Sequence, residues 1–330
     1  MNGIELVLIA LIMFVVAYKL YGGFLTKRLD VNNNKQTPAH TMSDGVDYCP
    51  AKAPVLLGHH FASIAGAGPI VGPVIAAGFG WIPVYLWVVL GSIFIGGVHD
   101  YASIIASVRH QSKSIGFIIQ QYIGVSGKKL FLIFAWATLI LVIAVFTIIV
   151  ADTFTHIPSA GTSSILFMIL AVFFGIAIYR LKVPLWIATT IGVVLLFLSI
   201  PAGNLYPIQL NAFEWQLLLL AYIFVASVTP VWILLQPRDY LNSFFLYALM
   251  IGGLVGVFFA APSINIPAYN TFSLEKVGYL FPALFVTVAC GAISGFHSIV
   301  GSGTTAKQLN KETDGRIVGY GGMLIEGMLA

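Results

Sequence analysis

The sequence predicts an all-α polytopic membrane protein with about nine complete transmembrane helices and a truncated tenth. Three observations predict this class: 59% of the 330 residues are hydrophobic, only 8% are charged, and long apolar segments recur along the chain. Soluble domains carry about 25% charged residues, so a chain this apolar cannot cover its own surface in water. In a bilayer, lipid replaces the polar surface and helices satisfy their own backbone groups. The composition excludes a soluble enzyme, a coiled coil and a disordered binding protein.

The expected spans follow from segment length. A spanning helix needs about 20 mostly apolar residues. On this rule the complete spans are 4–25, 55–79, 82–107, 130–151, 164–180, 184–200, 215–235, 241–261 and 281–301. A tenth begins near Val318 and is cut short at Ala330. We therefore expect a single transmembrane domain over residues 1–330, incomplete at its C-terminal end.

The basic residues predict the orientation of these spans. Cytoplasmic loops of membrane proteins carry an excess of Lys and Arg. If the first loop is cytoplasmic, 15 of the 16 Lys and Arg residues lie inside or at the inner interface, and only Lys276 lies outside. We therefore expect the N-terminus to face out. This bias accounts for the net charge of +4 and argues against a nucleic-acid partner.

Residues 109–129 stand apart from the spans. They are too polar to cross a membrane, yet they hold several large apolar side chains between basic ends. We interpret this stretch as a cytoplasmic segment that lies on the membrane surface. The sequence shows no low-complexity linker and no second, soluble domain.

The second span is rich in residues that disfavour a continuous helix. Its sequence, GHHFASIAGAGPIVGPVIAAGFG, holds six glycines together with Pro69 and Pro73. Proline cannot donate a backbone hydrogen bond, and glycine costs about 1 kcal/mol relative to alanine in a helix. We expect the helix to kink or unwind near 66–73, where a polar cavity or a ligand would satisfy the freed backbone groups. The alternative is that the glycines only allow close helix packing.

The ninth span ends in a similar stretch, SGFHSIVGSGTTAKQ. An offset of about 235 positions aligns five residues of the second span with five of the ninth: Phe61, Ser63, Ile64, Gly66 and Gly68 with Phe296, Ser298, Ile299, Gly301 and Gly303. The two spans run in opposite directions, as an inverted repeat requires, and paired interrupted helices point to the binding site of a transporter. We therefore expect an inverted-repeat, symporter-like fold with a second break at 301–305. Chance resemblance of two glycine-rich helices is the alternative.

Both interrupted segments supply candidate substrate-binding residues. Hydroxyls and freed helix-end amides can bind a carboxylate or coordinate an ion, and an imidazole can donate to a carboxylate or relay protons. The candidates are His59, His60, Ser63, Gly66, Gly68, Gly72, His297, Ser298, Gly301, Ser302, Gly303, Thr304 and Thr305. The alternatives are hydroxyls that join helices and histidines satisfied by backbone groups.

Ionisable residues inside spans predict an ion or proton pathway, because they are costly there. His99 and Asp100 lie in the third span, two to three turns before Arg109, and Glu326 lies in the truncated tenth span. We expect these three to form the coupling site. Asp100 could instead be structural, paired with His99 or Arg109. The coupling ion is expected to be H⁺, with Na⁺ left open.

No metal site and no cofactor are expected. The paired histidines lack the spacing of HExxH, and Cys49 and Cys290 lie far apart without a CxxC motif. The sequence also lacks GxxxxGK[ST] and GxSxG motifs, which argues against ATP hydrolysis and hydrolase chemistry.

Five stretches resemble one known family. They are DGVDYCP (44–50), GHHFASIAGAGPIVGPVIAA (58–77), GGVHDY (96–101), SGFHSIVGSGTTAKQLN (294–310) and VGYGGMLIEG (318–327). The chain resembles the carbon starvation protein A family, the CstA-type transporters, over its whole length. The resemblance implies an inner-membrane uptake carrier for small carboxylate nutrients, with pyruvate and peptides as substrates, expressed under nutrient limitation. It also implies proton coupling for the pyruvate carriers. Family members continue with further helices beyond the point where this chain stops.

Two functions from different classes remain open. The favoured one is a proton-coupled secondary transporter for pyruvate or peptides. The alternative is a membrane-embedded nutrient sensor or scaffold without transport, although the longest cytoplasmic loop, 26–54, is short for an output domain. An intramembrane enzyme is disfavoured, because no nucleophile and base lie at matching depth. The expected partners are a small-molecule substrate and the lipid bilayer, and a homo-oligomer is left open.

Overall fold

A computed structural model describes residues 2–45, 47–229 and 233–330 of the chain. The chain divides into two compact units, which we treat separately: unit 1 comprises residues 1–121 and 246–330, and unit 2 comprises residues 122–245. Residues 230–232, near the end of the seventh expected span, lie outside the described residues, as does Val46 of the DGVDYCP stretch. The expectation of a single transmembrane domain stays a prediction.

Unit 1 contains the N-terminal helices and the C-terminal interrupted segments. Its elements before the excursion into unit 2 are α1 (Gly3–Lys19), α2 (Tyr21–Arg28), α3 (Pro38–Thr41), α4 (Ala53–Ile64), α5 (Gly68–Ala76), η1 (Ala77–Phe79), α6 (Trp81–Gly91), η2 (Ser92–Gly96), α7 (Gly97–Arg109) and the start of α8 (Ile115–Tyr122). Its later elements are the end of α13 (Leu235–Ala260), β1 (Ser273–Leu274), β2 (Gly278–Tyr279), α14 (Leu280–Thr287), α15 (Ala289–Ala292), α16 (Gly295–Val300), η3 (Gly301–Thr305), α17 (Ala306–Gln308), η4 (Arg316–Gly321) and α18 (Gly322–Leu329). The two strands form an antiparallel pair that joins Ser273 to Tyr279 and Leu274 to Gly278.

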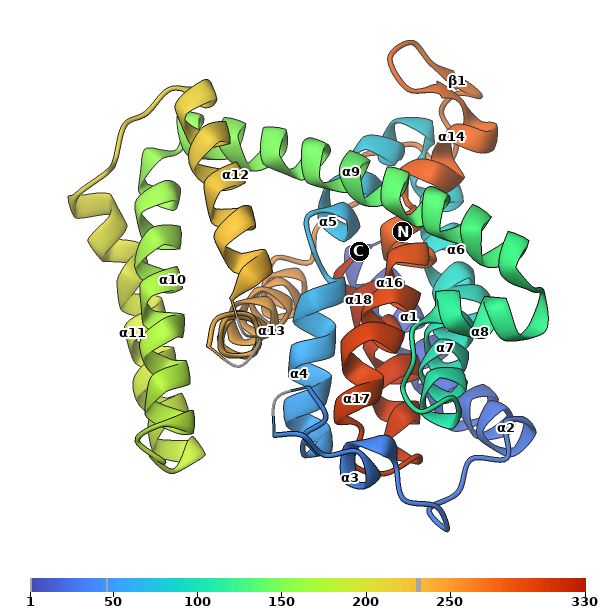
Figure 1. Ribbon diagram of the computed structural model, residues 1–330. Helices are drawn as coiled ribbons and strands as arrows, with labels where there is room; N and C mark the ends of the chain where they lie inside the picture. Colours follow the sequence, from blue (N-terminus) through green and yellow to red (C-terminus); the bar gives the residue numbers. More distant parts are fainter. Residues whose placement is uncertain (1, 46, 230–232) are drawn as a thin grey trace. The chain divides into compact units, whose positions relative to one another are not determined.

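Unit 2 consists of longer and more regular helices. They are α9 (Val125–His156), α10 (Pro158–Tyr179), α11 (Leu185–Leu205), α12 (Ala212–Val228) and the start of α13. Helices α10 and α11 run side by side in opposite directions (Figure 1). Small residues form their seam: Ser163 Oγ donates to the Ser199 carbonyl at 3.0 Å, and Gly203 lies against the backbone of Ser159. Such seams are typical of transmembrane helix pairs.

Most expected spans are confirmed as long apolar helices. By length and composition, the described residues contain six continuous helices able to cross a membrane, or seven with one bent pair included. The six are Gly3–Arg28, Trp81–Arg109, Val125–His156, Pro158–Ile178, Leu185–Leu205 and Leu235–Ala260. The seventh expected span corresponds to α12, which has 17 residues. A multi-pass all-α membrane protein is therefore supported, while the count of nine and the inverted repeat stay predictions.

The second span breaks near Gly66, as expected. Helix α4 ends at Ile64, α5 begins at Gly68, and the two are bent by 48°. Pro69 lies in the first turn of α5, where its missing N–H has no intrahelical partner to lose. The glycines on α5 also serve close packing, because a Cβ on Gly68 would lie 2.7 Å from the Cβ of Cys290. The helix therefore breaks near Gly66, and Gly68 serves close packing, so each interpretation holds for a different residue.

The expected position of the break in the ninth span is wrong. The backbone is interrupted upstream, where Ile293 and Ser294 are extended, and residues 301–305 form a continuous π-helical turn. Gly301 stays helical because it packs closely: a Cβ there would lie 3.1 Å from Ile104 Cγ1. A glycine of this kind allows close helix packing and does not require the helix to unwind. The two breaks therefore do not fall at matching positions of the proposed alignment.

Residues 109–129 contain a short helix and the start of a long one. Helix α8 covers Ile115–Tyr122, and α9 begins at Val125, earlier than the expected start of the fourth span at residue 130. Gly124, with φ of +104°, makes the turn between them. This conformation favours glycine because it has no Cβ. The location of α8 on a membrane surface stays a prediction.

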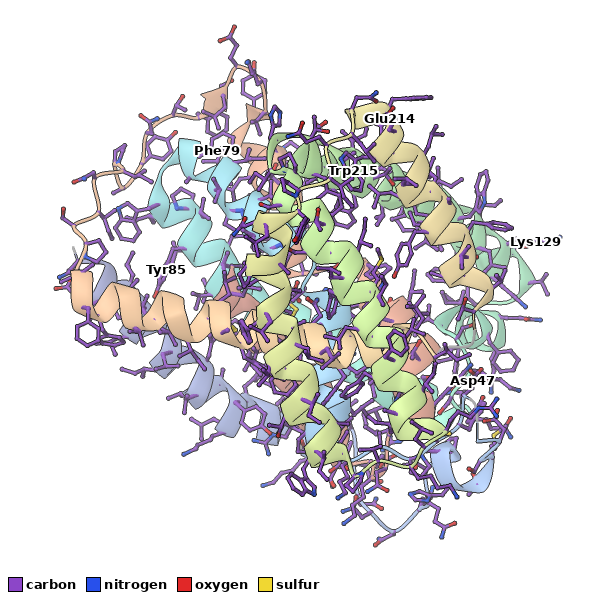
Figure 2. The ribbon with its side chains drawn as sticks, turned by 90° about the vertical axis from the view of Figure 1, so that its left-hand side faces the viewer. Asp47, Phe79, Tyr85, Lys129, Glu214 and Trp215 are labelled. Atoms are coloured by element: carbon purple, nitrogen blue, oxygen red, sulfur yellow. The ribbon has the colours of Figure 1, made fainter. Side chains whose placement is uncertain are left out.

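The core of unit 1 surrounds α7. Buried side chains of α1, η2, α7, η4 and α18 form one cluster, which includes Phe14, Ile93, Tyr101, Tyr320 and Leu324. Figure 1 shows α7 close to the red C-terminal helices, with α4 on their other side. In Figure 2, Phe79 and Tyr85 mark the turn into α6, and Tyr85 Oη donates to the Leu6 carbonyl at 2.9 Å.

Candidate functional site

A carboxylate lies in the centre of unit 1 between two imidazoles. Asp100, in the first turn of α7, is completely buried. One of its oxygens lies 2.9 Å from His99 Nδ1, and the other lies 2.8 Å from His297 Nδ1. A carboxylate can only accept hydrogen bonds, so each Nδ1 carries a proton and donates it to Asp100.

His297 connects this carboxylate to a second one. Its Nε2 lies 3.3 Å from Glu326 Oε2, and the side chains of both residues are fully buried. Cys290 Sγ lies 3.8 Å from Glu326 Oε1. A continuous series of polar groups therefore runs from His99 to Cys290, supplied by α7, α16, α18 and α15.

Helix irregularities accompany each member of this series. Asp100 follows the π-helical turn η2, and Glu326 follows η4. His297 lies in α16 just after the extended Ile293 and Ser294. π-helical turns occur frequently at functional sites, because they shift the register of the side chains that follow. The sequence allows close approach here, since a Cβ on Gly319 of η4 would lie only 2.9 Å from the Cα of Tyr101.

A second buried contact joins α4 to the end of η3. His60 Nδ1 lies 2.8 Å from Thr305 Oγ1, and His60 is fully buried. His60 Nε2 has no hydrogen-bond partner among the described residues. His59 is also buried, and its carbonyl accepts from Ser63 Oγ at 2.8 Å.

Of the other candidate substrate-binding residues, some make hydrogen bonds or packing contacts within the helices, and others are exposed or partly exposed. Ser298 Oγ and Ser302 Oγ donate to helix carbonyls, of Gly295 at 2.8 Å and of Ser298 at 2.6 Å, which is the structural reading of these residues. Gly66 is exposed at the break of the second span. The remaining candidates have these positions: Gly68 and Gly72 are packed against α15 and α14, Gly301 is packed against α7, and Gly303 and Thr304 are partly buried.

The structure therefore brings together His60, Asp100, His297, Thr305 and Glu326 from segments far apart in the sequence. Arg109, the alternative partner for Asp100, instead pairs with Glu312 at 3.0 Å. Sequence reasoning missed Cys290 as a member of the group. Its only signal was its place inside an apolar segment, ACGAISG, close to His297.

One apolar pocket lies next to this group. It has a volume of about 370 Å³ and is lined by residues of α1, α13 and α18, among them Leu11, Leu254 and Leu324. Its lining is apolar apart from Tyr18 and Lys19, so it suits hydrocarbon better than a carboxylate. It does not supply the polar groups of the candidate site.

These features define the class of the protein: a multi-pass helical membrane protein with interrupted helices and ionisable groups in its interior. The chain belongs to the CstA family, because the family described as carbon starvation protein CstA matches residues 2–330. The break of the second span, the buried pair of Asp100 and His297, and Glu326 all lie within this match.

Three curated relatives illustrate the family. The chain is 38% identical to the peptide transporter CstA of Escherichia coli and 36% identical to that of Campylobacter jejuni, in each case over 100% of this chain and 49% of the relative. It is 35% identical to the pyruvate/proton symporter BtsT of E. coli, over 100% of this chain and 48% of the relative. The chain thus spans about half the length of these relatives, which are named as transporters and not as enzymes. No solved structure matches the chain.

Proposed function

We propose that the protein is a secondary active transporter that couples the uptake of a small carboxylate nutrient, pyruvate or a peptide, to the movement of a proton. The observation that carries this proposal is the fully buried series Asp100–His297–Glu326, with separations of 2.8 and 3.3 Å. Ionisable groups inside a membrane protein are costly and by default mark a pathway. The names of the relatives support the transporter class and both substrates.

The distances between Asp100, His297 and Glu326 would allow this series to bind one proton and release it again. Asp100 holds the Nδ1 proton of His297, which leaves His297 Nε2 facing Glu326. One further proton between Nε2 and Glu326 gives either a neutral pair or an ion pair. The two forms differ by the transfer of one proton over a short distance, so this position can accept a proton from one side of the membrane and release it to the other.

The break of the second span supplies a site for the substrate carboxylate. The N-terminus of α5 presents the positive end of the helix dipole, which favours anions. Gly66 is exposed at this break, and Gly68 lies against Cys290, which contacts Glu326. His60 and Thr305 form a buried pair, and His60 Nε2 remains as a further polar atom of this group. Substrate and proton would therefore bind next to each other, as coupling requires.

The cellular setting forms part of the proposal. We place the protein in the cytoplasmic membrane with its N-terminus outside, on the basis of the basic residues in its loops. Alternating access would follow from movement of one group of helices against another around the fixed site. Na⁺ in place of H⁺ is the alternative coupling ion.

The experiment that tests this function is uptake into proteoliposomes that contain the full-length protein. Labelled pyruvate and a labelled dipeptide are supplied with an inward proton gradient and without sodium. We expect one of them to accumulate, and a protonophore to abolish the accumulation. The Asp100→Asn protein should equilibrate its substrate without accumulating it, whereas Asp152→Asn, which changes an exposed carboxylate of α9, should behave as the wild type.

Three results would contradict the proposal or one part of it. Substrate binding without any uptake would favour a nutrient sensor. Full proton-driven accumulation by Asp100→Asn would remove Asp100 from the coupling site. Accumulation that requires sodium would identify the other ion.

A further inference from the structure

Three side chains of unit 1 direct metal-ligating atoms toward a common point. One ligand atom each of Cys290, His297 and Glu326 lies within 4.8 Å of the other two. Cys290 Sγ lies 3.8 Å from Glu326 Oε1, and His297 Nε2 lies 3.3 Å from the other carboxylate oxygen, Glu326 Oε2. A tetrahedral Zn²⁺ ion with ligand distances of about 2.0–2.3 Å holds its ligands roughly 3.3–3.7 Å apart. The three side chains therefore stand close to the spacing that such an ion imposes.

A second, independent observation concerns the hydrogen bonding of these atoms. His297 Nε2 and Glu326 Oε2 are fully buried and face each other at 3.3 Å, and the geometry between them does not make a hydrogen bond; neither has a hydrogen-bond partner elsewhere among the described residues. A buried polar atom without a hydrogen bond is costly. Because both atoms are aimed at the same space, a cation there would satisfy both at once.

Asp100 contacts the side of the His297 ring that faces away from Cys290 and Glu326. Its Oδ2 lies 2.8 Å from His297 Nδ1. Metal-bound histidines almost always donate their other N–H to a carboxylate or carbonyl, which fixes the tautomer and the ring orientation. Here the hydrogen bond places the proton on Nδ1 and leaves the Nε2 lone pair directed at Cys290 and Glu326.

We propose that Cys290, His297 and Glu326 bind a divalent transition metal ion of the Zn²⁺ type. A thiolate, an imidazole and a carboxylate are the ligand types of Zn²⁺, whereas Na⁺, Mg²⁺ and Ca²⁺ select oxygen. Binding exchanges the thiol proton of Cys290 for the metal and releases this proton to solvent. Three protein ligands leave a fourth position for water or another small ligand.

From the sequence we expected no metal site, because the topology hides the proximity of these three ligands. Local motifs such as HExxH place two ligands on one helix turn. In this chain the ligands come from three elements, α15, α16 and α18. Their spacing in space is set by the break at Ile293 and Ser294 and by the packing of α18. No short motif can report such a site.

The metal site has a consequence for transport that rests on the proposed function. A bound ion would occupy His297 Nε2 and Glu326 Oε2, the two atoms that the coupling proton needs. We therefore expect Zn²⁺ to inhibit uptake.

The direct test measures Co²⁺ binding to the full-length protein, purified in detergent and treated with a chelator. Cobalt reports its own ligands, because a cobalt–thiolate bond absorbs in the near ultraviolet. We expect saturation at one Co²⁺ per chain, a thiolate band, and displacement of Co²⁺ by Zn²⁺. Cys290→Ser should lose the thiolate band.

Cys49 supplies the matched control. It is the other cysteine of the chain and lies in the first loop. Among the residues that the structure describes, Cys49 belongs to no group of three metal-ligating side chains. Cys49→Ser should therefore retain the cobalt spectrum of the wild type. Absence of saturable Co²⁺ binding by the wild type, or an unchanged thiolate band in Cys290→Ser, would overturn the metal site.

A second variant keeps the test decisive if Cys290→Ser does not fold. Asp100→Asn leaves the three ligands in place and weakens the hydrogen bonds that Asp100 accepts from His297 and His99. Loss of such a partner typically lowers metal affinity about 10–100-fold, with the thiolate band still present at saturation. An unchanged affinity would contradict the role assigned to Asp100.

The two proposals can fail separately. Co²⁺ binding is measured without substrate, so a protein that binds cobalt but never takes up substrate would refute the transport function and keep the metal site. A protein that accumulates substrate but binds no metal would do the reverse.

Discussion

Unit 1 and unit 2 are both built from apolar helices, but the helices of unit 2 are more regular than those of unit 1. Unit 2 is built from continuous helices of 17 to 32 residues. Unit 1 contains a bent helix pair, an interrupted ninth span and three π-helical turns. The fully buried His60, Asp100, His297 and Glu326 all lie in unit 1. In unit 2 a partly buried ion pair, Arg238 with Asp239, joins neighbours on one helix at 2.8 Å.

This contrast shows where irregular backbone is tolerated in an apolar environment. An interrupted helix leaves N–H and C=O groups that are costly in hydrocarbon. The interruptions persist where polar side chains from several elements meet, and regular helices suffice where only packing is needed. We infer that unit 1 carries the chemistry and that unit 2 contributes stability. The following predictions, from the largest effect to the smallest, test this division.

The largest effect is expected for Glu326→Gln in unit 1. Glutamine keeps the shape of the side chain but cannot carry the coupling proton. A gradient of one pH unit supports about tenfold accumulation for one proton per substrate, because 1.4 kcal/mol corresponds to a factor of ten. The variant should therefore lose about tenfold accumulation in proteoliposomes. Glu275→Gln, at an exposed position between β1 and β2, is the control and should keep it.

Trp215→Ala tests the structural role of unit 2. Trp215 of α12, labelled in Figure 2, is 2% exposed. Its ring meets that of Phe154 edge to face, with the ring centroids 5.0 Å apart. Truncation of a buried tryptophan costs about 3–5 kcal/mol, so the unfolding temperature in detergent should fall markedly. Trp136→Ala, at a position that is 67% exposed, should change it little. A coupling defect in folded Trp215→Ala protein would argue against the division of roles.

Gly68→Ala probes the close contact at the break of the second span. A Cβ there would lie 2.7 Å from the Cβ of Cys290, and overpacking of this kind costs about 1–3 kcal/mol. We expect a lower unfolding temperature. Gly252→Ala in α13 has open space around its Cβ and should be neutral or slightly stabilising, because alanine favours a helix. Equal behaviour of the two variants would show that α5 does not pack tightly on α15.

The smallest effect is expected at the start of α12. Asn211 caps this helix: its side chain accepts from Glu214 N at 3.0 Å, and Glu214 Oε2 accepts from Asn211 N at 2.9 Å. Loss of an N-cap costs about 1 kcal/mol. Asn211→Ala should therefore lower the unfolding temperature slightly without changing the accumulation ratio. Asn204→Ala, exposed at the end of α11, should have no effect on either.

The long apolar helices could be predicted from the sequence, because a helix that crosses the hydrocarbon of a bilayer must be apolar over about 20 residues. Six expected spans correspond to continuous apolar helices, and the break near Gly66 followed from glycine and proline chemistry. The break in the ninth span was misplaced because glycine content does not reveal packing. Gly301 is held in a helix by Ile104, whereas Ile293, a β-branched residue, takes the extended conformation.

The candidate site was predictable as a set of residues but not as a geometry. We selected Asp100, His297 and Glu326 individually, because ionisable side chains are energetically costly inside membrane spans. Asp100 and His297 are 197 positions apart, and their contact depends on how α7 and α16 pack. Cys290 carried almost no sequence signal, since a single cysteine in an apolar segment is usually a small hydrophobic side chain. Its significance comes only from its distance to Glu326.

Proton movement during substrate entry is the decisive measurement for the Asp100–His297–Glu326 series. Proteoliposomes with a pH-sensitive dye inside, and no imposed gradient, receive the substrate identified by uptake. The account predicts that the interior acidifies as substrate enters through the wild type, and that Asp100→Asn admits substrate without acidification. Equal acidification by both proteins would contradict the assignment of the proton to the Asp100–His297–Glu326 series.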